Sequence, residues 1–460
     1  MRMMSGKPTE KTLIARVDTM KVTRWHWQLV MLCMVGIAIE NFDMTAIALA
    51  MPVIARSWEL PPSMIGVLLS GSSLGLLIGA SVFGTLSDSI GRKKTFILTT
   101  VVYSLFVGLS AFAQDFTQLY IARVLAGIGL GGFIPVASAY VSEFAPVKVR
   151  GRFMGIFTIG NGIGYCLAVI ASMVLVSAMS EGWRWVFAIG AVGFLIIPAV
   201  IKLLPESVRW LMGKGRNEEA LQVVEQVEQR ALGQIIVPHE IALLEVKELS
   251  KQSSQASVKR SGGYSRIFSR ELLRKSILAA ILWFVSGYTF YGFIQWMPTF
   301  LTKEMGYTLT AGYTFTLLAA AVGTGTPGIA CGFSSDYLGR RLTLTICMLA
   351  YAVSGFFFLW FGGWWILPLY WFSSAMTSQL YIYSPELFPT AVRGTGLGFA
   401  SSIGRVAGFL APIVIGYLVQ DYGLAGVISV NGVLLTIGVL VVWVMGTETK
   451  GNAQTQAQSF

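Results

Sequence analysis

Charged side chains are scarce in this chain of 460 residues: 12% of them are Asp, Glu, Lys or Arg, whereas 54% are hydrophobic. A soluble globular domain carries about 25% charged residues. A soluble fold of this length could not bury so much apolar sequence, so lipid must cover part of it. The scarcity of charge therefore excludes a soluble protein and predicts an integral membrane protein.

Residue types that common chemistries need are also few. The chain has two His and four Cys, without the spacing of a metal site. The phosphate-binding pattern Gly-x-x-x-x-Gly-Lys-Ser/Thr does not occur, and no nucleophile–base arrangement is visible. We therefore expect no enzyme activity, no cofactor, no metal and no use of ATP. The sequence also lacks an Asn-x-Ser/Thr glycosylation site, which agrees with a bacterial origin.

Twelve apolar runs have about the 20 residues that a helix needs to cross a bilayer. They cover 28–54, 63–86, 95–113, 117–140, 153–177, 185–204, 276–301, 309–333, 342–361, 364–384, 394–419 and 423–446. The sequence thus predicts an all-α membrane protein with twelve transmembrane helices. Its expected parts are an N-terminal segment 1–27, a six-helix bundle 28–204, a linker 205–275, a second six-helix bundle 276–446 and a tail 447–460.

The basic residues are distributed unevenly between these segments. With the N-terminus inside, the inward segments hold 28 Lys and Arg, and the outward loops hold only Arg56, Arg184 and Lys303. An excess of basic residues in cytoplasmic loops is general in membrane proteins. The pattern predicts an inner-membrane protein with both termini and the linker in the cytoplasm, and it accounts for the net charge of +11 without a nucleic-acid partner.

Two loop motifs occur twice. GTLSDSIGRKK follows the second run and GFSSDYLGRR the eighth, with equivalent residues 248 apart; SEFAPVKVRG follows the fourth run and PELFPTAVRG the tenth, 243 apart. Such repeats indicate a duplicated six-helix unit. The motif residues that we single out are Gly84, Asp88, Gly91, Arg92, Asp336, Arg340, Glu143, Arg150, Glu386 and Arg393.

The first motif suggests a conformational latch. Gly84 and Gly91 would permit a tight turn and close helix contact, and Asp88 could accept charge-assisted hydrogen bonds from Arg92. Such a latch holds one conformation and releases in another. The alternative is a basic loop that only sets topology.

The paired motifs resemble those of the major facilitator superfamily along essentially the whole chain. The segments PESVRWL at 205–211, PELFP at 385–389, ETKG at 448–451 and ARVDTMKVTRWHW at 15–27 are similar to those of its sugar porters and bacterial metabolite–proton symporters. That branch includes niacin and aromatic-acid permeases and carriers like the synaptic vesicle glycoproteins. The resemblance implies a secondary transporter built from two related halves.

Four charges lie near the centres of the apolar runs: Glu40, Asp43, Arg123 and Arg405. Each costs about 2.5–3.5 kcal/mol on insertion scales, so they must face the interior and pair. Glu40 and Asp43 are three residues apart and share a helix face, so one of them, predicted to be Asp43 with Glu40 as its partner, could bind and release a proton. The alternative is a structural ion pair with an Arg. The resemblance adds that an Arg at position 123 is typical of proton-coupled members.

Arg405 has no acidic partner among the apolar runs of its own half. It either reaches Glu40 or Asp43 in the other half or binds an anionic substrate, whose carboxylate suits the planar guanidinium. Polar and aromatic residues at helical spacing predict the rest of a substrate site. The candidates besides Arg405 are Tyr288, Tyr291, Gln295, Tyr370, Tyr381 and Asn161.

Sugar porters resemble one another in a Gln-Gln-x-Ser-Gly-x-Asn run, which here reads Trp-Phe-Val-Ser-Gly-Tyr-Thr at 283–289. The loss of every amide argues against a hexose. We therefore expect a monomeric carrier that imports a small aromatic or heteroaromatic monocarboxylate with protons. The alternatives are a sugar or polyol symporter, an efflux carrier of drugs or metabolites, and a receptor that keeps the fold without transport.

Overall fold

The computed structural model describes residues 11–235, 263–323, 326–389 and 392–449. The start of the expected N-terminal segment (1–10), part of the linker (236–262) and the end of the tail (450–460) lie outside the described residues. All the regular elements in the described parts are helices. The chain is therefore all-α over these residues, as its sequence predicts.

The first half of the chain forms one group of helices. They are α1 (Lys11–Asp18), α2 (Arg24–Ser57), α3 (Pro62–Ile90), α4 (Arg92–Ser110), α5 (Phe116–Phe144), α6 (Arg150–Leu175), α7 (Gly182–Gly190), η1 (Ala191–Ile196) and α8 (Ile197–Leu203), followed by α9 (Val208–Gly213) and α10 (Asn217–Leu232).

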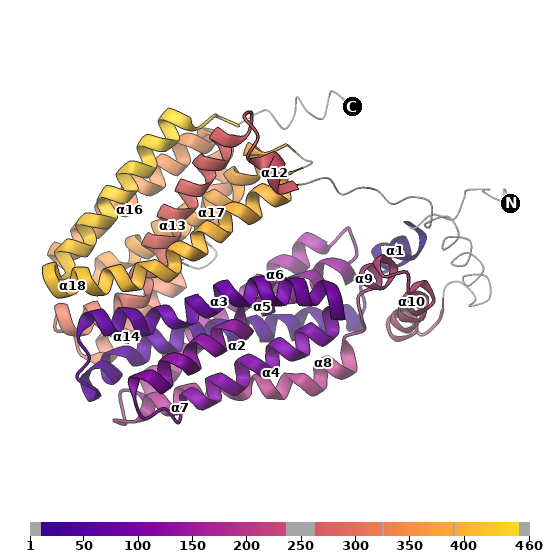
Figure 1. The fold of residues 1–460 in the computed structure, drawn as a ribbon, viewed down its shortest axis with the longest axis horizontal. Coiled ribbons are helices and arrows are strands. Elements are labelled where there is room, and N and C mark those ends of the chain that lie inside the picture. The colour runs from indigo at the N-terminus through magenta and orange to yellow at the C-terminus, as the bar shows by residue number, and fades with distance from the viewer. Residues whose placement is uncertain (1–10, 236–262, 324–325, 390–391, 450–460) are drawn as a thin grey trace.

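The second half forms another group. It consists of α12 (Gly263–Ile267), α13 (Leu273–Thr299), η2 (Phe300–Glu304), α14 (Leu309–Gly323), α15 (Thr326–Leu338), α16 (Arg340–Phe361), η3 (Gly363–Trp365), α17 (Ile366–Leu387) and α18 (Arg393–Met445). Figure 1 shows the two groups as two bundles.

Twelve helical stretches match the twelve expected spans. Within the described residues, nine helices are long and apolar enough to cross a membrane. One of them, α18, consists of two helices joined at Gly423, whose φ of +61° is unfavourable for other residues. The 19-residue α4 and the 22-residue α17 complete the set. The prediction of twelve transmembrane helices is therefore confirmed.

Glycines let the helices of each half approach closely. A Cβ added at Gly75 of α3 would lie 2.1 Å from the carbonyl oxygen of Val124 in α5, and one at Gly127 of α5 would lie 2.3 Å from that of Ser72. In the other half, a Cβ at Gly287 would lie 2.2 Å from the Gly404 carbonyl oxygen. Small residues at such contacts are typical of helix packing in membranes.

The turn glycine of the repeated loop motif behaves as expected. Gly91 has a φ of +100° between α3 and α4, and its counterpart Gly339 has a φ of +90° between α15 and α16. The expected close contact at Gly84 is absent, because no heavy atom of the described structure lies within 4 Å of a Cβ built there. The contact is therefore not made in this conformation, and its formation in another conformation stays a prediction.

The N-terminal helix α1 binds the helix that follows the first bundle. Arg16 donates two hydrogen bonds to the buried carboxylate of Glu228 in α10, at 2.8 and 2.7 Å. Asp18 pairs with Arg150 at the start of α6, at 2.6 Å. These contacts hold α1 beside α9 and α10 at one end of the molecule, which we call the motif face because it also carries the repeated loops (Figure 1).

The two bundles meet at the opposite end, which we call the distal face (Figure 1). The Tyr313 hydroxyl of α14 donates to the Leu49 carbonyl oxygen of α2 at 2.7 Å, and the hydroxyls of Tyr165 and Tyr370 are 2.7 Å apart. A Cβ at Gly66 of α3 would lie 2.2 Å from the Pro412 carbonyl oxygen of α18. Towards the motif face the bundles diverge. The conformation is therefore closed at the distal face.

Replacing Gly66 by leucine should open the distal face. The new side chain would overlap the rigid backbone at Pro412, so α3 and α18 could not remain in contact. Spin labels at Ser57→Cys and Thr308→Cys, on opposite bundles, should move several ångströms apart in a pulsed electron paramagnetic resonance measurement. The partly exposed native Cys166 would be replaced by serine in this background.

A matched control is Gly155→Leu in α6, because a Cβ at Gly155 meets no heavy atom of the described residues within 4 Å. This variant should leave the label distance unchanged. If Gly66→Leu and Gly155→Leu gave the same distance as the parent, the Gly66 contact would not control closure of the distal face.

Candidate functional site

The charged residues expected inside the membrane divide into two groups. Asp43 of α2 and Arg123 of α5 form a bidentate ion pair, with both oxygen–nitrogen distances at 2.7 Å. Both side chains are fully buried. The Ser72 hydroxyl accepts from Nε and Nη2 of Arg123 at 3.0 and 2.9 Å, and the Phe187 ring lies 5.3 Å from the guanidinium. Good geometry and added hydrogen bonds are what a buried ion pair needs to offset desolvation.

Glu40 lies one turn before Asp43 on α2 and has different surroundings. Its side chain is buried, but its Oε2 atom has no hydrogen-bond partner within the described structure. The charges that act on it are Arg405 of the second bundle, which attracts it, and Asp43, which repels it. A buried carboxylate without a full set of partners is unusual and costly. The two acids are thus not equivalent: Arg123 fully pairs with Asp43, whereas Glu40 faces the other bundle.

Arg405 of α18 is half-buried. It interacts electrostatically with Glu40 and with Tyr291 and Tyr381. Over the parts of the chain that the structure describes, it makes no ion pair within 4 Å and no hydrogen bond. The Tyr291 ring fills the space at Gly408, where an added Cβ would lie 2.9 Å from it. A guanidinium beside two tyrosines, with no ion pair within 4 Å among the described residues, is suited to bind a carboxylate with an attached ring.

The other expected substrate-binding residues lie in several environments. Tyr288 and Gln295 of α13 are buried, and the Tyr288 hydroxyl and the Gln295 Oε1 atom lack hydrogen-bond partners in the described region. The Gln295 Nε2 atom lies 3.5 Å from the Ser73 hydroxyl of the first bundle. Tyr381 is 57% exposed and lies edge-on to Trp283, with ring centroids 4.9 Å apart. Unpaired buried polar atoms of this kind are available to a ligand or to water.

Tyr370 and Asn161 have partners of their own. The Tyr370 hydroxyl binds that of Tyr165 across the bundles, and Asn161 accepts a hydrogen bond from Asn41. No interaction of the described residues links either one to Arg405. Ser72 and Phe187 were not singled out from the sequence. Ser72, Gly75 and Gly79 lie on one face of α3, and this spacing could have identified Ser72.

The repeated motifs form equivalent polar clusters in the two bundles. In the first, Arg92 donates to Asp88 and to the Ser87 hydroxyl, both at 2.7 Å. The Glu206 carboxylate accepts from the backbone N–H groups of Arg92 and Lys93 at 2.7 and 3.2 Å. A carboxylate at the first turn of a helix satisfies free N–H groups and complements the helix dipole. Glu206 thereby fixes the start of α4.

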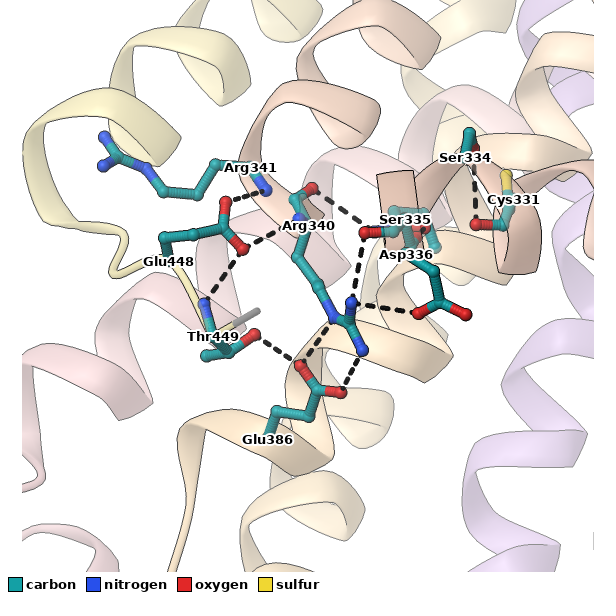
Figure 2. A network of polar contacts seen from close by, with 10 residues as sticks. Cys331, Ser334, Ser335, Asp336, Arg340, Arg341, Glu386, Glu448 and Thr449 are labelled. Carbon is teal, nitrogen blue, oxygen red and sulfur yellow. Dashed lines mark hydrogen bonds and ion pairs between the residues drawn. The ribbon is translucent and has the colours of Figure 1, made fainter. Parts of the chain in front are cut away.

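Figure 2 shows the cluster of the second bundle, centred on Arg340. Arg340 donates to both oxygens of Glu386 at 3.0 Å and to Asp336 at 3.2 Å. Glu448 accepts from the backbone N–H groups of Arg340 and Arg341 at 2.9 and 3.2 Å, as Glu206 does in the first bundle. The motif members are therefore held together within each bundle.

A third repeated pair completes these clusters. The Ser207 hydroxyl binds Glu143, and the Thr449 hydroxyl binds Glu386. Sequence reasoning did not assign Glu206, Ser207, Glu448 and Thr449 to the latch, although an acid followed by a hydroxyl residue was the available signal. Arg150 binds Asp18 instead of Glu143, and Arg393 is the first residue of α18.

Replacing Asp88 by alanine should slow any conformational cycle more than it changes ligand affinity. The Asp88 side chain is 74% exposed, and its ionic contact among the described residues is with Arg92 of its own bundle. If Asp88 acts as a latch, its ionic contacts must therefore differ in another conformation. An exposed ion pair contributes at most about 1 kcal/mol, so a roughly fivefold fall in turnover is expected. Turnover and substrate affinity would be measured on the same reconstituted preparation.

Glu219→Ala is a suitable control, because Glu219 also forms an exposed local ion pair, with Arg216 at 2.6 Å, outside the motifs. It should change neither quantity. An Asp88→Ala variant with altered affinity and normal turnover would contradict the latch.

Comparison with known proteins identifies the family. The family model described as "Sugar (and other) transporter" matches residues 36–459. The niacin transporter NiaP of Acinetobacter baylyi is 30% identical over 446 residues, which cover 95% of this chain and 98% of the relative. The benzoate transport protein of the same organism is 27% identical, covering 88% of this chain and 86% of the relative.

Solved structures agree on the fold. The partially occluded inward-open structure of the xylose transporter XylE from E. coli has a TM-score of 0.71 at 19% identity, covering 93% of this chain and 99% of that chain. The family match spans most of the sequence, and the predicted twelve-helix architecture is present. The chain is therefore a membrane transporter that belongs to the sugar (and other) transporter family of the major facilitator superfamily.

Proposed function

We propose that this protein imports a small organic anion, an aromatic or heteroaromatic monocarboxylate, together with protons. The observation that carries the proposal is Arg405, a half-buried cation in mid-helix without an ion pair among the described residues and beside Tyr291 and Tyr381. A carboxylate bound there would form a close ion pair with Arg405, and the two tyrosines would contact its ring. Tyr288 and Gln295 of α13 offer buried polar atoms that have no hydrogen-bond partner among the described residues.

The names of two relatives support the substrate class. One is a niacin transporter and another a benzoate transport protein, and both compounds are flat aromatic acids. The likeness to a xylose transporter, at 19% identity, supports only the fold. The run at 283–289 has no amide side chain to bind sugar hydroxyls, so we rank a sugar below an acid.

Proton coupling is proposed for Glu40, Asp43 and Arg123, with Glu40 as the acid that binds the proton. Because Arg123 already pairs with Asp43, protonation of Asp43 would leave a buried arginine without its counter-charge, at a cost of several kcal/mol. Among the described residues, Arg405 is the cation that acts on Glu40. When the substrate carboxylate takes Arg405, Glu40 becomes neutral by binding a proton. One anion and one proton would then enter together.

Transport is proposed to follow alternating access. The described conformation is closed at the distal face and diverges towards the motif face. We assign the motif face to the cytoplasm of a bacterial inner membrane, because the basic residues gather there. This conformation would then face inward. Tyr165 and Tyr370 would form part of the distal gate, and we propose that the protein works as a monomer.

The proposal is tested with purified protein in proteoliposomes under an imposed pH gradient, acidic outside. Radiolabelled nicotinate and benzoate should accumulate, whereas nicotinamide, benzamide and xylose should not. Collapse of the gradient with a protonophore should abolish accumulation. If xylose accumulated and neither acid did, the proposed substrate class would be wrong and the sugar alternative would be supported.

A further inference from the structure

A pocket lies at the distal face, between the two bundles. Its volume is about 830 Å³, within the range of roughly 300–1,000 Å³ typical of small-molecule sites. Its walls come from the end of α2, from the α6–α7 connection at 176–181, and from η2 with the segment leading to α14. Because both bundles contribute, its shape must change whenever the bundles move relative to each other.

Two cations from opposite bundles line this pocket. They are Arg56 of α2 and Lys303 of η2. Neither makes an ion pair within 4 Å in the described parts of the chain, although Lys303 interacts at longer range with Glu304. The pocket is therefore positively charged.

The acidic residue that lines the pocket is already paired. Glu181 is an acid of the pocket wall, but it pairs with Arg184 at 2.6 Å. Arg184 in turn donates to the carbonyl oxygens of Ala111 and Ala113 at 2.9 and 2.6 Å. Arg184 is thus engaged in holding the loops, and Arg56 and Lys303 remain for a ligand.

The rest of the lining suits a compact organic anion. The hydroxyl-bearing residues Ser57, Ser177, Tyr307 and Thr308 also line the pocket. The segment that presents Lys303 is a π-helix over Phe300–Glu304, a rare geometry that is frequent at functional sites.

The pocket is separate from the Arg405 cluster in this conformation. The Tyr313–Leu49 hydrogen bond and the Gly66–Pro412 contact close the bundles together. On α2, Leu49 precedes the pocket residues Val53 and Arg56 by one and two turns towards the centre. A ligand in this pocket would therefore lie outside the closed gate.

We propose that this pocket is an outer vestibule, in which Arg56 and Lys303 hold the carboxylate of the organic anion before the distal gate opens. The inference rests on the proposed function for the identity of the anion. Opening of the bundles would separate the two cations and release the anion towards Arg405. A cationic vestibule also raises the local concentration of an anionic ligand.

Benzoate transport in proteoliposomes of pure phosphatidylcholine tests the vestibule. The double variant Arg56→Gln/Lys303→Gln should raise the KM for uptake from the distal side by about tenfold, as expected for lost hydrogen bonds to a charged group. Maximal rate and the KM for efflux from the motif side should not change, which also shows that the variant is folded. Lys214→Gln, which removes an exposed charge at the motif face, should alter nothing.

The vestibule proposal would be overturned if the double variant left the KM for uptake from the distal side unchanged. It would also be overturned if the KM rose equally for uptake from the distal side and for efflux from the motif side. An effect that appears only when anionic lipid is present would overturn it as well, because the cations would then bind a headgroup.

A labelling measurement separates this inference from the proposed function. In the Cys166→Ser background, Ser57→Cys should react with a membrane-impermeant maleimide, and benzoate should slow the reaction. The double variant should lose this protection. If benzoate protects Ser57→Cys but is not transported, the vestibule proposal stands and the proposed function is refuted. If benzoate is transported but gives no protection, the proposed function stands and the vestibule proposal is refuted.

Discussion

Replacing Arg405 by alanine should weaken the binding of benzoate or nicotinate by roughly tenfold to a hundredfold, the value of one lost hydrogen bond to a charged group. Binding of the corresponding neutral amides should hardly change, because they do not need a counter-charge. Arg405→Lys should lie between the two, since an ammonium keeps the charge but lacks the planar fork that binds both carboxylate oxygens. Equilibrium binding of each acid and its amide to the purified variants measures the effect.

The comparison of acid with amide distinguishes two roles for Arg405. If it binds the substrate, the variants lose their preference for the acid. If it is only the structural partner of Glu40, the preference persists in Arg405→Ala while the yield of folded protein falls. Arg270→Ala, an exposed arginine just before α13, is the control and should keep both the preference and the yield.

The second large effect is expected at the two acids of α2. Glu40→Gln keeps the shape of the side chain but cannot bind a proton, so pH-driven accumulation of the acid should be lost while exchange of labelled for unlabelled substrate continues. Uptake by the parent should be faster at lower external pH, and uptake by Glu40→Gln should not depend on pH. The charges that face Glu40 are Arg405 and Asp43, and both remain in this variant.

Asp43→Asn should act mainly on folding. It leaves the fully buried Arg123 without its bidentate partner, which costs about 3–5 kcal/mol. The double variant Asp43→Asn/Arg123→Gln removes both charges and should restore much of the folded protein, seen as a higher yield and melting temperature. If the double variant is folded but does not accumulate substrate, and Glu40→Gln does accumulate it, the coupled proton belongs to Asp43, as the sequence alone suggested.

Much of the fold could be predicted from local sequence patterns. Apolar runs long enough to span a bilayer, together with loop motifs at constant offsets, are sufficient to predict the twelve helices and the repeat. Gly91 and Gly339 were recognisable because a tight turn needs a positive φ. These features depend on neighbouring residues in the chain, and such residues are visible in a sequence.

The site was less predictable because its partners are distant in sequence. Spacing put Glu40 and Asp43 on one face, but only the packing of α2 against α5 shows that Arg123 belongs to Asp43. The space at Gly408, one turn from Arg405, is occupied by the Tyr291 ring of α13. A sequence gives no information about which side chain fills a space left by a glycine on another helix.

The helix α1 places a condition on the order of synthesis. Arg16 and Glu228 are separated by 212 positions in the chain, and ribosomes add about 5–20 residues per second. The N-terminal helix must therefore wait roughly 10–40 s for its partner, by which time the first bundle has been translated. Folding of the first bundle together with α1 thus requires α10, which follows the last membrane helix of that bundle. The part of the chain that folds as one unit during translation therefore extends into the linker.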